Sequence, residues 1–74
     1  MKKFTVAVTV TIKGDKTFPL WDKVWLDLDG DRSDLINLQM QLKLVKQDVN
    51  KDMNRRGFAL RDVDINIEFV SGRS

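Results

Sequence analysis

The sequence predicts an α+β domain, in which a three-stranded antiparallel or mixed sheet packs on one long helix in the order β-β-α-β. Every second residue is apolar in segments 4–12, 24–28 and 63–69, as is typical of strands that bury one face. Between the second and third of these segments, apolar residues recur at steps of three and four, which indicates an amphipathic helix. The 74 residues leave room for one domain. We therefore expect residues 1–74 to form a single small unit, with a frayed tail at about 71–74.

The first strand has the most regular alternation in the chain. Its inward positions are Phe4, Val6, Val8, Val10 and Ile12, and its outward positions are mostly Thr. Because the run alternates with Thr and reaches Lys13-Gly14 without a small-residue cleavage site, it indicates a strand and not a targeting segment. A turn at 13–16 is expected to follow it.

The second strand is expected over residues 23–29, with Gly30 as its end. Val24, Leu26 and Leu28 would face the core, which leaves Trp25 on the outward side. Pro19 cannot donate a hydrogen bond to a strand ladder, so segment 17–20 is expected to be irregular or to lie on an edge.

The helix is expected to begin with Asp31 or Ser33 as its capping residue and with Asp34 in its first turn. Its core-facing stripe comprises Leu35, Leu38, Leu42, Val45, Val49 and Met53, widened on one side by Ile36, Met40 and Leu44. Gly57 is expected to stop the helix in a left-handed conformation, and Phe58 to fold back on the last turn.

The third strand is expected to begin near Asp62 and to end at Phe69. Its inward positions are Val63, Ile65, Ile67 and Phe69, and its outward positions are Asp62, Asp64, Asn66 and Glu68. The helix returns the chain across the sheet, so this strand should lie beside the first one. A right-handed crossover then gives the spatial order 2-1-3, with the first strand in the centre.

Composition excludes several classes of site. The chain has neither Cys nor His, which excludes disulfides and the usual zinc sites. The acidic run 27–34 does not fit a calcium-binding EF-hand loop. Counted from Asp27, the sixth position is Arg32 where such a loop has Gly, and the twelfth is Leu38 where it has Glu. No apolar stretch approaches the ~18 residues needed to span a bilayer. We therefore expect a soluble cytoplasmic protein without a metal or cofactor.

Catalytic activity is not expected. Without His, Cys or Tyr, most of the usual nucleophiles and bases are missing. Paired carboxylates occur at Asp27 with Asp29 and at Asp62 with Asp64, but each pair should point into open solvent. A solvated carboxylate has no environment to tune its pKa for proton transfer. The sequence therefore predicts a protein that is not an enzyme.

The tryptophans and the outward acids are the candidates for a protein interface. An exposed Trp is a frequent interface anchor, and Trp25 has the outward parity. The candidate set is Trp21, Trp25, Asp27, Asp29, Asp62 and Asp64. Alternatively, Trp21 with Phe18 caps the open end of the core, and Trp25 lies over Thr9 or Thr11. The two edge strands can add a strand from a partner or form a homodimer.

Two other function classes stay open beside a protein-binding module for an unidentified partner. The net charge of +2 permits nucleic-acid binding, for which the candidates are Lys51, Arg55, Arg56 and Arg61 near the helix C-terminus. Against it, the outward sheet face is acidic at its flanks, where a single-strand binder needs basic and aromatic residues. The third class is a structural protein that works by self-assembly.

The element order is similar to that of small phage-encoded inhibitors of host enzymes, such as those of bacterial RNA polymerase. The likeness consists of a hairpin beginning near Lys3-Phe4, one helix, a turn at Gly57-Phe58 and a last strand. It covers nearly the whole chain, and no functional residue can be matched. What the resemblance implies is an inhibitor or accessory protein of phage or mobile-element type.

Overall fold

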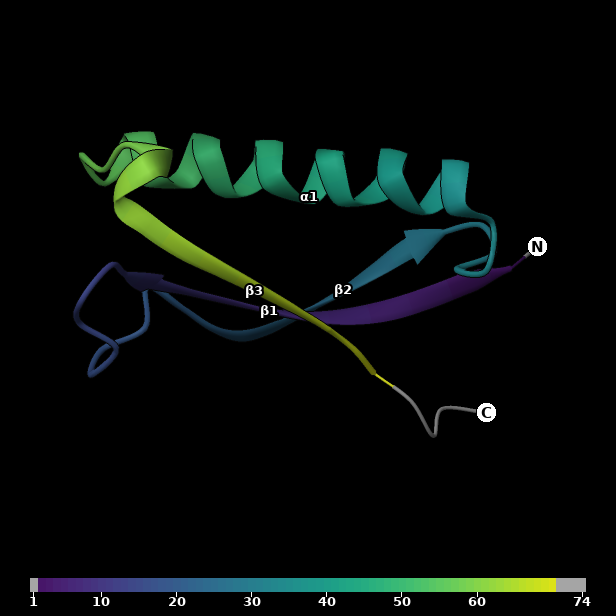
Figure 1. The fold of residues 1–74 in the computed structure, drawn as a ribbon, viewed down its shortest axis with the longest axis horizontal. Helices are drawn as coiled ribbons and strands as arrows, with labels where there is room; N and C mark the ends of the chain where they lie inside the picture. Colours follow the sequence, from purple (N-terminus) through teal and green to yellow (C-terminus); the bar gives the residue numbers. More distant parts are fainter. Residues whose placement is uncertain (1, 71–74) are drawn as a thin grey trace.

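A computed structural model describes residues 2–70 and contains three strands and one long helix (Figure 1). The elements follow the predicted order, as strand β1 (Lys3–Ile12), strand β2 (Trp21–Asp29), helix α1 (Leu35–Arg55) and strand β3 (Val63–Phe69). A single 3₁₀ turn, η1 (Leu60–Asp62), was not predicted and precedes β3. The α+β class is therefore confirmed, and the predicted tail at 71–74 lies outside the described residues.

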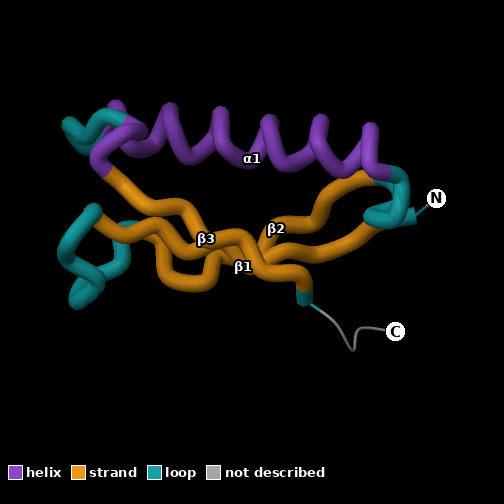
Figure 2. Tube along the Cα trace, viewed as in Figure 1, coloured by secondary structure: helices purple, strands orange, loops and turns teal. Residues whose placement is uncertain are grey.

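The sheet has the predicted order, β2-β1-β3, and both neighbouring pairs are antiparallel. Val6 pairs with Leu26 on one side, and Val8 pairs with Ile67 on the other. Helix α1 lies along one side of the sheet, called here the inner face (Figure 2). No described element covers the opposite side, called here the open face.

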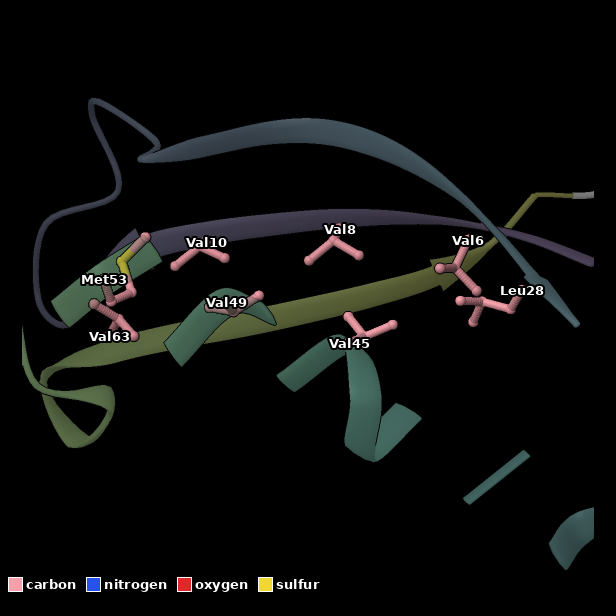
Figure 3. Close-up of a cluster of buried hydrophobic side chains, with 8 residues drawn as sticks. All are labelled: Val6, Val8, Val10, Leu28, Val45, Val49, Met53 and Val63. Carbon is pink, nitrogen blue, oxygen red and sulfur yellow. The ribbon is translucent and has the colours of Figure 1, made fainter. Parts of the chain in front are cut away.

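The core forms between β1 and the second half of α1. Its eight buried residues are Val6, Val8, Val10, Leu28, Val45, Val49, Met53 and Val63 (Figure 3). The inward alternation of β1 brings three valines under the helix, where Val45, Val49 and Met53 meet them at steps of four. Each such side chain contributes on the order of 1.5–3 kcal/mol when fully buried.

Four of the nine residues in the predicted helix stripe are exposed. The expectation that Ile36, Met40 and Leu44 widen the core-facing stripe is wrong, because all three are exposed, Ile36 by 78%. At about 100° per residue, Ile36 and Met40 lie roughly opposite Val49 on the helix surface. These three side chains form a line at steps of four along the outside of α1, called here the outer ridge. Leu35 is exposed as well.

The helix N-terminus is capped by Asp34 and not by Asp31 or Ser33 as predicted. The Asp34 side chain accepts hydrogen bonds from the backbone N–H groups of Ile36 and Asn37, at 3.1 and 3.3 Å. Asp31 instead accepts from the backbone N–H of Ser33 at 3.0 Å and from its hydroxyl at 2.7 Å. The two Asp residues thus order successive turns of the connection between β2 and α1.

The helix C-terminus ends as predicted, in a Schellman motif. Gly57 has a φ of +88°, the left-handed region that favours glycine. The N–H of Phe58 donates to the carbonyl of Met53 at 2.8 Å, and the N–H of Gly57 donates to that of Asn54 at 3.1 Å. Phe58 packs against the core and closes this end of the molecule.

An irregularity in β2 changes which way its first residues point. Val8 pairs with Val24 and Val10 pairs with Trp21, so two steps along β1 correspond to three along β2. Lys23 takes up the extra residue with a φ of +47°. A bulge of this kind reverses the alternation of side chains. β2 begins at Trp21, two residues before the predicted start. Because of the reversal, Trp21 lies on the inner face beside Val10.

Candidate functional site

Trp25 stands in the middle of the open face. Its register partner on β1 is Ala7, and Ala7 pairs on its other side with Glu68 of β3. Trp25 is 56% exposed, while Ala7 is only 8% exposed although it faces away from the helix. Because Ala7 is small and nearly covered, its larger neighbours Trp25 and Glu68 form most of the surface of the row Trp25–Ala7–Glu68.

Asp27 borders this row and is held in place. Its carboxylate accepts a hydrogen bond of 2.7 Å from the hydroxyl of Thr5, its register partner on β1. Asp29 lies one row further, opposite Lys3. Asp27 and Glu68 therefore stand on neighbouring rows around Trp25, and the surface there combines one aromatic anchor with two carboxylates.

The other predicted acids lie at the far end of the open face. Asp64 pairs with Thr11 and lines a hollow together with Thr9, Lys16 and Asn66. Asp64 and Glu68 are four residues apart on β3, which is about 13 Å at ~3.3 Å per residue. Asp62 ends η1, and its backbone carbonyl accepts from the N–H of Lys13 at 3.0 Å. The structure thus separates Asp62 and Asp64 from the surroundings of Trp25.

Trp21 does not share a face with Trp25. Its side chain is half-buried against the core, and its indole N–H donates to Oδ2 of Asp52 at 2.7 Å. This hydrogen bond lowers the pKa of Asp52, with smaller contributions from Arg56 and Arg55. The position agrees with the alternative in which Trp21 caps the end of the core, but Phe18, which was expected to join it there, is 78% exposed and does not.

The four cations considered for nucleic acid gather at the C-terminal end of the helix. Lys51 and Arg55 belong to α1, Arg56 caps it, and Arg61 lies in η1, which contacts α1. Nε of Arg56 lies 2.9 Å from Oδ2 of Asp52, and Nη2 of Arg55 lies 3.8 Å from Oδ1. Two of the four cations thus share one carboxylate, which reduces the positive field that a phosphate backbone would meet.

Glu68 is the residue that the sequence-based site omitted. It has the outward parity of Asp62 and Asp64, but only the register of β1 with β3 brings it into line with Trp25. The strand order 2-1-3 predicts that Glu68 and Trp25 flank the same strand. The row they share depends on the length of the turn before β3, which the residue pattern does not fix.

Two further features are absent from residues 2–70. No three acidic side chains in this range come close enough together to hold a metal ion. No helix in it has the length and the apolar content needed to cross a membrane.

Comparisons with known proteins leave the family open. The resemblance to phage-encoded inhibitors of host enzymes stays a prediction, because it depends on the order of elements alone. Searches against protein-family models, curated proteins and solved structures gave no significant match to this chain.

Proposed function

We propose that the chain is a non-catalytic, cytoplasmic protein-binding module that docks through its open face around Trp25. The observation that carries the proposal is the exposure of the Trp25 ring in the row Trp25–Ala7–Glu68, on a sheet face that no described element covers. Large aromatic side chains in such positions supply much of the binding energy of protein interfaces. Asp27 and Glu68 beside the ring favour a partner with basic groups around an apolar pocket.

A basic partner surface fits an accessory or inhibitory role of the phage or mobile-element type. Proteins that hold nucleic acid carry such basic surfaces, and an acidic module can compete for them. The basic helix end is the weaker candidate surface, since Asp52 already binds Arg55 and Arg56. The proposal therefore places the partner on the sheet and leaves the helix end in solvent.

The test is an affinity capture with a matched control. Tagged wild-type chain, Trp25→Ala, Phe18→Ala and Lys51→Ala/Arg61→Ala are each incubated with bacterial lysate, one half of which is treated with nuclease, and the retained proteins are identified. Phe18 is the control, because it is an exposed aromatic residue in the loop before β2 and does not belong to the row around Trp25. We expect one discrete protein to be retained by wild type and by Phe18→Ala, and to be lost with Trp25→Ala.

The same experiment distinguishes the alternatives. Binding that disappears with nuclease and with the double variant Lys51→Ala/Arg61→Ala would contradict the proposal and favour nucleic acid. That variant leaves the contacts of Asp52 intact, so a loss of binding would not follow from a damaged helix end. A mass above one chain in solution without any captured protein would favour self-assembly instead.

A further inference from the structure

The two edges of the sheet differ in regularity. β3 runs for seven residues without a break in its pairing with β1. β2 is interrupted by the bulge and by Lys23 with its positive φ. Bulges and irregular backbone are among the devices that prevent an edge strand from pairing with another chain. β3 lacks this protection and is the edge that can accept a further strand.

Backbone hydrogen bonds show which groups of β3 face outward. The N–H of Val70 donates to the carbonyl of Thr5, and the N–H of Lys13 donates to the carbonyl of Asp62, both at 3.0 Å. In an antiparallel ladder these bonding positions alternate along the strand. Even-numbered residues of β3 therefore bond to β1, and the backbone N–H and C=O groups of Ile65, Ile67 and Phe69 point to the open edge.

Apolar surface borders the same edge on the inner face. Coverage of the inward side chains of β3 declines along the strand, from buried Val63 through half-buried Ile65 and Ile67 to Phe69, which is 43% exposed. Figure 1 shows β3 starting beneath the end of α1 and running away from the helix toward its last residues. This divergence explains why coverage declines toward Phe69.

One side chain covers part of this apolar surface. The guanidinium of Arg32 lies 5.1 Å from the centre of the Phe69 ring and shields one part of it. A strand added beside β3 would place alternate side chains on the inner face, next to Ile67 and Phe69, and would extend this apolar layer.

Charge selects the kind of strand. On the open face, β3 presents the exposed carboxylates of Asp64 and Glu68. A second copy paired antiparallel about Asn66 would set Asp64 of each chain opposite Glu68 of the other, and like charges directly opposite are destabilising. Lys or Arg at alternate positions of an incoming strand would instead stand beside both carboxylates.

We propose that the β3 edge binds an extended segment of a partner protein as a fourth strand, with apolar side chains next to Ile67 and Phe69 on the inner face and basic side chains beside Asp64 and Glu68. This inference rests on the proposed protein-binding function but uses a different surface from Trp25. Backbone pairing at Ile65, Ile67 and Phe69 provides the attachment, and the alternation of apolar and basic residues provides the selectivity.

The test is an NMR titration of the ¹⁵N-labelled chain with capped nonapeptides. The first peptide alternates Lys and Val. The second replaces Lys by Glu, and the third keeps Lys and Val but is N-methylated at the amides that would donate to β3. We expect the first alone to shift the amides of Ile65, Ile67 and Phe69 and to slow their hydrogen exchange. In Asp64→Asn/Glu68→Gln, which changes only exposed side chains, its affinity should fall about three- to tenfold.

Each other outcome overturns the inference. Equal binding of the Glu peptide removes the charge selectivity, and equal binding of the N-methylated peptide removes the strand pairing. Concentration-dependent protection of the β3 edge amides without peptide would make a second copy the occupant. Trp25→Ala should leave peptide binding unchanged. If capture does not depend on Trp25 while the peptide still binds, the proposed use of the open face is contradicted and the edge inference stands. If capture depends on Trp25 but the peptide does not bind, the edge inference alone is contradicted.

Discussion

The indole N–H of Trp21 donates a 2.7 Å hydrogen bond to the carboxylate of Asp52, which lies 31 residues further along the chain. The same carboxylate accepts from Nε of Arg56 at 2.9 Å. One acidic side chain on the last turns of α1 thus joins the first residue of β2 to the helix cap. Since Trp21 also packs against the core, this contact fixes the end of the helix over the beginning of the strand.

Trp21→Phe is expected to lower the free energy of unfolding more than Trp25→Phe. The first change removes a hydrogen bond to a carboxylate at a half-buried position, and the second changes an exposed ring. Urea unfolding followed by circular dichroism compares the two. An equal effect of the two variants would contradict a larger contribution of Trp21 to stability.

Met53→Ala is expected to destabilise the protein by about 2–5 kcal/mol, as large-to-small changes in cores do. Met53 is fully buried between α1 and β1. The matched control is Met40→Ala on the same helix, which should change stability by no more than about 0.5 kcal/mol because Met40 belongs to the exposed outer ridge. Comparable losses in both variants would mean that the outer ridge is covered in solution.

Gly30→Ala is expected to cost more stability than Gly57→Ala. Both glycines have positive φ, so each substitution carries the left-handed penalty of roughly 1–2 kcal/mol. At Gly57 a methyl group would meet open space, whereas at Gly30 it would collide with the amide group of Asn37. That amide donates a 2.9 Å hydrogen bond to the carbonyl of Asp29.

The double variant Gly30→Ala/Asn37→Ala separates the collision from the backbone penalty. Removing the Asn37 amide gives the new methyl group space, so the two changes should be less damaging together than the sum of each alone. Thermal unfolding of the four chains in this cycle measures the coupling. Strict additivity would contradict the proposed collision.

Acid should weaken the fold through Asp31. Hydrogen bonds from the backbone and hydroxyl of Ser33, with a smaller contribution from Lys2, lower the pKa of Asp31 from 3.8 to about 2. Because the folded-state pKa is the lower one, this stabilisation is present above about pH 4 and is lost as the pH falls toward 2. Urea unfolding between pH 5 and 2 should therefore show a shallower acid dependence in Asp31→Asn.

The order of the two causes at Asp31 can be checked by NMR titration of its carboxylate. Ser33→Ala removes the hydroxyl donor and should raise the pKa of Asp31 more than Lys2→Ala does. The Lys2 ammonium lies 3.1 Å from the carboxylate but is largely exposed, so solvent screens it. A larger shift in Lys2→Ala would show that Lys2 lowers the pKa of Asp31 more than the Ser33 hydroxyl does.

Elements with strict periodicity could be predicted from the sequence. β1, β3 and the end of α1 at Gly57 follow from alternation and from a single left-handed glycine. The strand order followed from the handedness of the crossover. In these segments each local preference agrees with the fold, which is the condition under which pattern arguments succeed.

The wrong predictions occurred where several residues can fill one role or where the backbone departs from the regular alternation of its strand. Asp31, Ser33 and Asp34 can all cap a helix, and dihedral angles decide between them. The bulge at Lys23 shifts the start of β2 and turns Trp21 inward. No residue pattern in this segment predicts the bulge. The outer ridge was misassigned because apolar residues at steps of four indicate a face but not which face is buried. The site around Trp25 was predicted in part, and Glu68 was missed because its row depends on register.

The reversal of side-chain direction at Lys23 gives the protein two optical reporters of different events. Trp21 and Trp25 are the only two tryptophans in the chain, and they belong to one strand yet face opposite sides of the sheet. In Trp25→Phe the remaining emission comes from the ring over the core and follows folding. In Trp21→Phe it comes from the partly exposed ring on the open face and would follow the proposed docking. A single fluorescence titration of each variant can thus separate a ligand that binds the open face from one that loosens the fold.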